Sequence, residues 1–130
     1  MQVSDIKTYL ENRPFPLDIP TDEELEKYMN FSLLIIKVFY DVDFTNETSE
    51  DAITAIGEEV AYLIDNNPNE DIYAMYNYLK KFSVAGAISG EVVEKTIGFL
   101  GTFVKNLMAA LGYELIQTDA GKAYYTYSIF

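Results

Sequence analysis

The chain carries two pairs of adjacent glutamates, Glu23-Glu24 and Glu58-Glu59, whose carboxyl groups could serve acid–base chemistry. Two carboxyl groups that face the same bond can act as a general acid and a general base. Both pairs fall in segments with helical spacing, where successive side chains point about 100° apart and cannot converge on one bond. We therefore predict that the paired glutamates form a solvated helix face.

The sequence contains no cysteine and no histidine. Their absence excludes disulfides, thiolate metal sites, the usual zinc ligands and every Ser-His or Cys-His arrangement. Any remaining chemistry would depend on carboxylates, lysine, tyrosine or a hard metal ion. We accordingly predict a non-enzymatic protein with no catalytic residues, no metal site and no cofactor.

The segment DVDFT, from Asp41 to Thr45, follows an apolar run and resembles the nucleophile motif of haloacid dehalogenase-like phosphatases. The resemblance implies that Asp41 attacks phosphorus, that Asp43 acts as acid and base, and that magnesium binds both. That motif closes the first strand of a doubly wound sheet, whereas the run here begins with a helix capping box. The phosphatase is therefore a remote alternative to an acidic helix end and turn. A calcium loop starting at Asp41 is excluded, because it requires glycine and glutamate where Asn46 and Ala52 stand.

Negative charge is concentrated in the first part of the chain, whose formal net charge is −12. Residues 1–75 hold 17 acidic and 4 basic residues, whereas residues 76–130 hold 4 acidic and 5 basic ones. The shortage of Lys and Arg argues against ordinary nucleic-acid binding, which depends on neutralising phosphates. Two interpretations stay open. The excess of acid keeps the protein soluble, or one face repels or mimics DNA while the other is buried against partners.

Length and composition favour a single folded domain over residues 1–130. The chain is 49% hydrophobic and 15% aromatic, which is too apolar for a disordered segment. Its start lacks the pattern of a secretory signal, so we expect a cytoplasmic protein. The longest near-continuous apolar run, residues 31–40, is about half the length that spans a bilayer. It therefore predicts a buried element and no membrane contact.

Cap residues and apolar spacing predict a mainly α fold, a small bundle of about five helices within residues 1–112. Ser4 caps a helix over residues 5–10, and three prolines then predict an ordered or extended loop. A capping box of Thr21 and Glu24 begins a second helix at residue 22 that runs to about residue 40. Its second half is apolar nearly all round, so it is central in the bundle or contacts another subunit. Further helices are predicted at about 50–65, from 68 onward and over 91–111, the last ending in a left-handed cap at Gly112.

Aromatic residues gather at the end of the C-terminal segment, residues 113–130, which predicts a β-hairpin or an extended tail. The stretches YELIQ and AYYTYSIF flank a turn-rich segment, and so apolar a terminus is costly to leave exposed. It either folds back on the core or docks on a partner. The apolar, uncharged and glycine-spaced segment 83–90 is likewise predicted to be a loop that packs against another surface. The candidate partner-binding residues are Tyr124, Tyr125, Tyr127, Ile129, Phe130, Val84 and Ile88.

The order of elements resembles that of the head–tail connector, or adaptor, proteins of tailed bacteriophages. The resemblance rests on a short first helix (DIKTYL), an acid-capped second helix, a tightly joined helix pair and the apolar segment FSVAGAISGE before a last helix. It implies a virion structural protein that forms a homo-oligomeric ring beneath the portal and receives the next neck or tail component. DNA would pass through the ring without specific binding, and the protein would occupy the virion neck, and the host cytoplasm during assembly.

A small acidic inhibitor of the anti-CRISPR or DNA-mimic type is the leading alternative. Such a protein would use its carboxylates to occupy a basic protein surface. The alternative predicts a compact monomer or dimer, whereas the connector predicts a ring.

Overall fold

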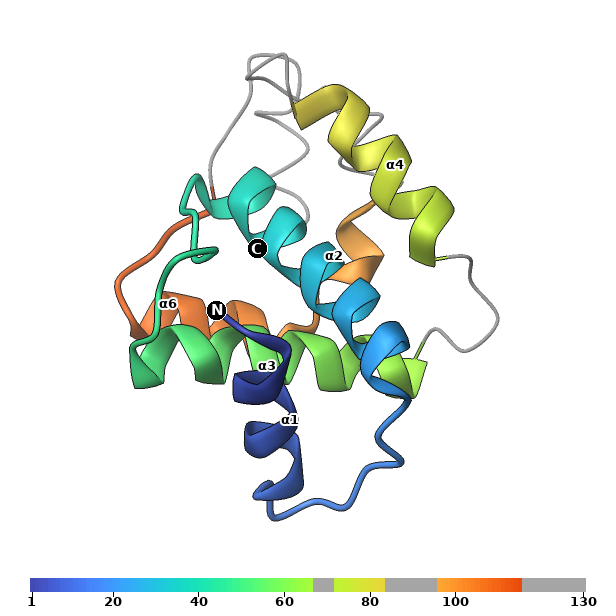
Figure 1. Ribbon diagram of the computed structural model, residues 1–130. Helices are drawn as coiled ribbons and strands as arrows, with labels where there is room; N and C mark the ends of the chain where they lie inside the picture. Colours follow the sequence, from blue (N-terminus) through green and yellow to red (C-terminus); the bar gives the residue numbers. More distant parts are fainter. Residues whose placement is uncertain (67–71, 84–95, 116–130) are drawn as a thin grey trace.

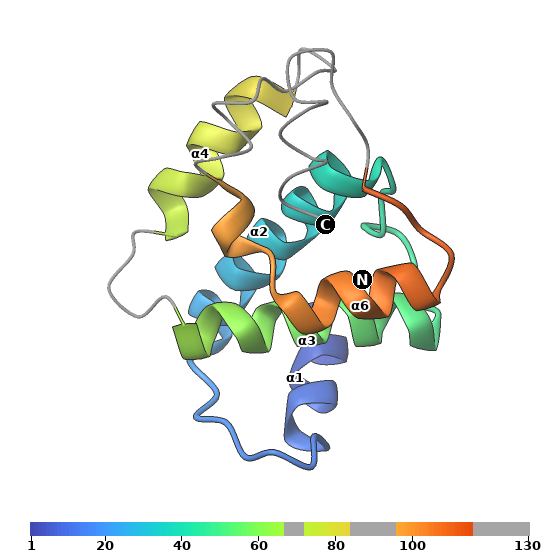
Figure 2. The ribbon, with the colours of Figure 1, turned by 180° about the vertical axis from the view of Figure 1, so that it is seen from behind.

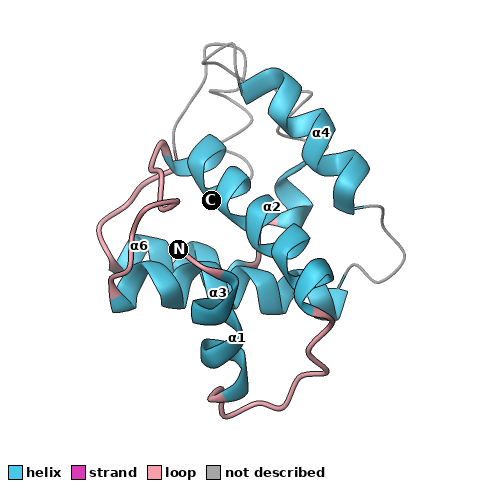
Figure 3. Cartoon of the chain, viewed as in Figure 1, coloured by secondary structure: helices cyan, strands magenta, loops and turns pink. Residues whose placement is uncertain are grey.

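The computed structural model describes residues 1–66, 72–83 and 96–115, and these residues form helices joined by loops (Figures 1 and 3). The prediction of a mainly α fold is confirmed for this part of the chain. Most of the predicted C-terminal hairpin lies outside it. The helices are α1 (Val3–Glu11), α2 (Asp22–Tyr40), α3 (Glu50–Asn66), α4 (Ile72–Ser83), the short 3-10 helix η1 (Ile97–Phe99) and α6 (Thr102–Ala110).

Helices α2 and α3 form the centre of the arrangement. They pack on each other, and α1 packs against both of them. Helix α4 packs on α2, and α6 packs on α3, as the front and back views show (Figures 1 and 2). Each central helix therefore carries one outer helix of its own.

Helix α2 begins where its capping residues predict. The Thr21 hydroxyl accepts a hydrogen bond from the Glu24 backbone N–H at 3.3 Å, and acidic residues in the first turn complement the helix dipole. The helix ends at Tyr40, and its cap residue Asp41 takes the left-handed conformation at φ 54°. Eight of its last ten residues are buried, and this confirms the central position. They are Phe31, Ser32, Leu33, Ile35, Ile36, Val38, Phe39 and Tyr40.

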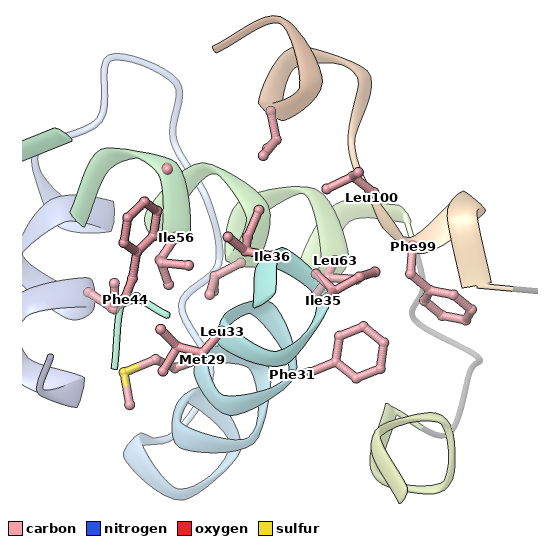
Figure 4. Packing of buried hydrophobic residues seen from close by; sticks show 14 of the residues in the cluster. Met29, Phe31, Leu33, Ile35, Ile36, Phe44, Ile56, Leu63, Phe99 and Leu100 are labelled. Carbon is pink, nitrogen blue, oxygen red and sulfur yellow. The ribbon is translucent and has the colours of Figure 1, made fainter. Parts of the chain in front are cut away.

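The core lies between the two central helices and continues to η1 (Figure 4). Ile36 of α2 meets Ile56 and Leu63 of α3, and all three side chains are fully buried. Phe31 of α2 packs on Phe99 of η1 with ring centroids 5.5 Å apart. Burying one such side chain contributes about 1.5 to 3 kcal/mol, so these contacts position η1 and the chain that follows it.

The prediction of one continuous last helix is wrong. The chain forms η1 at residues 97–99, and Leu100 and Gly101 then take extended backbone conformations before α6 begins. Glycine has poor helix propensity, and the Gly101 N–H bonds to the side chain of Glu59 rather than to a helix carbonyl. Gly112 at φ 94° ends α6 as predicted.

The predicted cap of the first helix is also wrong. Ser4 lies inside α1, which begins at Val3, and the Gln2 backbone N–H donates to the Asp5 carboxylate at 2.8 Å. Carboxylates in a first turn satisfy unpaired backbone donors in this way. The loop between α1 and α2 has no regular structure, as its prolines predict.

Candidate functional site

The residues that the sequence favours for partner binding lie outside the described part of the chain. The set comprises Tyr124, Tyr125, Tyr127, Ile129, Phe130, Val84 and Ile88. Their role stays a prediction, and the site below is built from other residues.

Asp41 and Asp43 form a helix end and a turn. Asp41 terminates α2, so the run before the motif is a helix where the phosphatase fold has a strand. The Asp43 carboxylate accepts a hydrogen bond from the Thr45 N–H at 2.9 Å, and hydrogen bonding to Thr45 lowers the pKa of Asp43. Lys37 lies 3.9 Å from the same carboxylate at the surface. Among the described residues, no group of three or more acidic side chains is placed to hold a metal ion.

The two glutamate pairs differ in their surroundings. Glu23 and Glu24 are exposed at the start of α2, as predicted. The prediction of a solvated face is wrong for Glu58 and Glu59, because the first is largely buried and the second is wholly buried. Both carboxyl groups are instead held by hydrogen bonds from other segments of the chain.

Glu58 is the centre of a hydrogen-bonded cluster between α1 and α3. Arg13 Nε and Nη2 donate to its two carboxylate oxygens at 2.8 and 3.0 Å, and the Tyr9 hydroxyl donates as well. Burial by itself would raise the pKa of Glu58, but the hydrogen bonds from Arg13 and Tyr9 lower it below its ordinary value. Burial and the hydrogen bond to Glu58 raise the pKa of Tyr9. The cluster is thus an ionised carboxylate bound by a guanidinium and a neutral phenol.

The same arginine fixes an exposed phenylalanine. Arg13 Nη1 donates to the Phe15 backbone carbonyl at 3.3 Å, while the Phe15 side chain is 70% exposed. Residues 13–18, here called the Phe15 loop, lie beside the C-terminal end of α3. The loop and α3 enclose a shallow cleft of about 380 Å³ lined by Pro16, Leu17, Asp18, Ile64 and Asp65. The site therefore combines an outward aromatic ring with a cleft that contains two carboxylates.

Such a surface suits protein recognition. Interfaces commonly place aromatic residues at the centre and polar residues at the rim, and a large apolar side chain in water gains free energy when a partner covers it. The charges favour a partner whose apolar pocket is edged by lysine or arginine. Sequence reasoning missed Phe15, although its position between Pro14 and Pro16 was a usable signal, because a ring flanked by prolines has little chance to pack inside a helix.

Negative charge extends over much of the described surface. Thirteen of the sixteen acidic residues in residues 1–66, 72–83 and 96–115 are exposed, and their mutual repulsion opposes contact between two such faces. They are Glu11, Asp18, Asp22, Glu23, Glu24, Glu26, Asp41, Asp43, Glu47, Glu50, Asp51, Asp65 and Glu114.

Comparisons of the chain with protein-family models, with curated proteins and with solved structures find no match. In the described ranges no helix has the length and apolar character needed to cross a bilayer.

Proposed function

We propose that this protein is a non-enzymatic structural subunit that acts by binding other proteins, and that its place is the neck of a tailed bacteriophage. Copies of the chain would form a ring under the portal that lines the DNA channel. One observation carries the proposal of protein binding: the exposed ring of Phe15 stands on a loop that the largely buried Arg13–Glu58 pair holds against α3. The phage setting is supported by the order of helices in the sequence.

The hydrogen bond from Arg13 to the backbone of the Phe15 loop is an advantage for binding. Ordering a loop at an interface costs free energy, and a loop already fixed in the free protein avoids most of that cost. Arg13 is suited to this role because its planar guanidinium bonds both oxygens of Glu58 and still reaches the Phe15 carbonyl. An exposed aromatic ring on a loop whose backbone is held in this manner is suited to become an interface hot spot when a partner covers it.

The exposed carboxylates fit a position beside DNA that must move. Negative side chains repel phosphate, so DNA slides past such a wall without binding to it. The proposed subunit would direct its acidic residues toward the channel and use apolar contacts, the Phe15 ring among them, toward its neighbours.

The proposal is tested by the mass of the purified full-length protein, measured by light scattering across concentration and with a portal protein added. We expect rings or portal-dependent assemblies. We expect Phe15→Ser to raise the protein concentration at which they form at least tenfold, the equivalent of about 1.4 kcal/mol. Phe103→Ser is the matched control, because Phe103 is 61% exposed on α6 and lies outside the Phe15 loop.

A monomer at every concentration that ignores portal protein would contradict the connector proposal. Assembly that survives Phe15→Ser but not Phe103→Ser would support the connector proposal and would show that the contact surface includes α6 in place of the Phe15 loop.

The second candidate function is an acidic inhibitor that occupies a basic nucleic-acid-binding surface. The thirteen exposed carboxylates favour it, since a field of this sign attracts a basic partner. An inhibitor would stay a small particle in light scattering and would bind a basic protein more weakly as salt is added.

A further inference from the structure

Glu59 is a residue of α3 whose side chain reaches Gly101 at the start of α6, and it is wholly removed from water. Its Oε1 accepts a hydrogen bond from the Gly101 backbone N–H at 3.0 Å. Its Oε2 has no hydrogen-bond partner among the described residues. An ionised carboxylate in this position would keep a charged oxygen buried and unpaired, which is costly, whereas a neutral carboxyl is tolerated.

The segment that Glu59 binds is attached to α3 by a second residue as well. The Tyr62 hydroxyl donates to the Gly98 carbonyl at 2.7 Å. The Tyr62 ring also lies directly against the Gly101 backbone, where an added Cβ would come within 2.9 Å of a ring atom. Residues 98–101 are thus held by one hydrogen bond that depends on a titratable acid and one that depends on a phenol.

This attachment lies directly before helix α6, whose N-cap residue is Gly101. Among the helices of the described residues α6 packs chiefly on α3, and Val104 and Met108 are its buried residues. Elements that rest on one neighbour open locally at a lower free energy than central ones. Weakening the attachment at 98–101 should therefore lower the free energy of opening of α6 more than that of α2 or α3.

We propose that Glu59 is a proton-dependent latch, which holds α6 on α3 while its carboxyl is neutral and releases residues 98–101 and α6 when the carboxyl ionises. The titratable groups around Glu59 are Tyr40 of α2, Tyr62 of α3 and Lys105 of α6. Lys105 favours the ionised carboxyl, whereas Glu59 contributes to the raised pKa of both tyrosines. Release would uncover the apolar strip of α3 beneath Val104 and Met108. The latch is a property of this chain alone and requires neither a ring nor a partner.

The direction of the pH effect follows from the burial. Burial raises the pKa of Glu59 well above its usual range, against the opposing effects of the Gly101 N–H and Lys105. The docked state is therefore fully stabilised below the ordinary value of 4.5 and loses that stabilisation as pH rises through the raised pKa. Between these two values the opening equilibrium of α6 should increase about tenfold for each pH unit.

Hydrogen exchange of the α6 amides, followed against pH in the full chain, tests the latch. We expect their protection in the wild type, relative to Glu59→Gln at the same pH, to fall with rising pH by up to about tenfold per unit. Glutamine imitates the neutral carboxyl, because its amide oxygen can still accept from Gly101. Tyr62→Phe is the matched control, since it removes the hydrogen bond to Gly98 and should lower α6 protection by the same factor at every pH.

Two outcomes would overturn the latch. One is an α6 protection whose pH dependence is the same in the wild type and in Glu59→Gln. The other needs no variant and so holds if Glu59→Gln folds poorly: an NMR titration of the wild type in which the Glu59 carboxyl ionises at or below the ordinary 4.5.

Discussion

Arg13 and Glu58 form an ion pair that is largely removed from water, with side chains only 14% and 11% exposed. Lys7 and Asp22 form a pair of the same charges at the surface, with side chains 44% and 71% exposed. The contribution of a salt bridge to the free energy of unfolding depends on how far its side chains are exposed to water. Breaking a buried pair leaves a charge without compensation, whereas water replaces the lost partner at the surface.

We predict that Arg13→Met lowers the free energy of unfolding by roughly 2 to 3 kcal/mol, because Glu58 then stays buried without its guanidinium. The control Lys7→Met should change it by less than about 1 kcal/mol. Urea denaturation of the two variants gives the comparison. Equal changes in the two variants would show that the Arg13–Glu58 pair contributes no more to the free energy of unfolding than the surface pair does.

The Arg13 effect should also depend on pH. Glu58 has a lowered pKa in the folded chain, so its pairing stabilises the protein above the unfolded-state value and loses that effect as pH falls through the lowered one. The stability difference between the wild type and Arg13→Met should therefore shrink as pH falls below about 4, near the ordinary pKa of a glutamate. Urea titrations at a series of pH values would reveal it, and a constant difference would argue against an ionised Glu58.

Gly57 is a second residue whose replacement has a clear expectation. A Cβ at this position would lie 2.2 Å from the Cδ1 of Tyr9, whose hydroxyl is bound to Glu58. Gly57→Ala should therefore displace Tyr9 and destabilise the chain by about 1 to 3 kcal/mol, despite the better helix propensity of alanine. Gly98→Ala is the control, because no atom of the described residues, apart from Gly98 and its two chain neighbours, lies within 4 Å of the added Cβ. Thermal unfolding measures both, and an unchanged Gly57→Ala would mean that the ring can turn aside at little cost.

At the scale of elements, helix starts depend on single side chains. Thr21 satisfies a backbone donor at the start of α2, and its replacement by alanine should cost about 1 kcal/mol. Thr21→Ser should restore most of the stability, because serine retains the hydroxyl. Chemical denaturation tests the pair, and a full loss in Thr21→Ser would assign the effect to the methyl group instead of the cap.

Four of the helices in the described residues, α1 to α4, were predictable because their signals are local. Caps and apolar spacing within a few residues determine where these helices run, apart from the first residues of α1. The break before α6 was not predictable in this way, because Gly101 bonds to a side chain 42 positions earlier. The burial of Glu58 and Glu59 depends on the same kind of distant contact. No local pattern distinguishes these acids from Glu23 and Glu24.

The candidate site shows the same limit. The prolines of the Phe15 loop predicted an ordered or extended loop, but the Phe15 backbone is held by Arg13, which is itself paired with a glutamate in a different helix. Sequence reasoning placed the partner-binding residues in segments 83–90 and 113–130 because of their apolar composition. That prediction concerns residues outside the described ranges, and it stands beside the Phe15 loop as a separate hypothesis.

At the scale of the whole molecule, charge decides how added salt should act. Two copies of a chain with net charge −12 repel each other. Raising the salt from about 0.01 M to 0.15 M shortens the Debye length from about 30 Å to 8 Å. We therefore predict that self-assembly strengthens over this range, with light scattering as the measurement. Assemblies that dissolve as salt is added would instead indicate attraction between opposite charges.

The packing of α1, α2 and α3 also bears on synthesis. These three helices contact one another and are consecutive within residues 3–66. Helices α4 and α6 come later in the chain, and each packs on a helix that precedes it. Chains fold from the N-terminus as they leave the ribosome, and contacts between neighbouring segments form fastest. If α1, α2 and α3 fold as they emerge, the surfaces on which α4 and α6 pack would be complete before those two helices are translated.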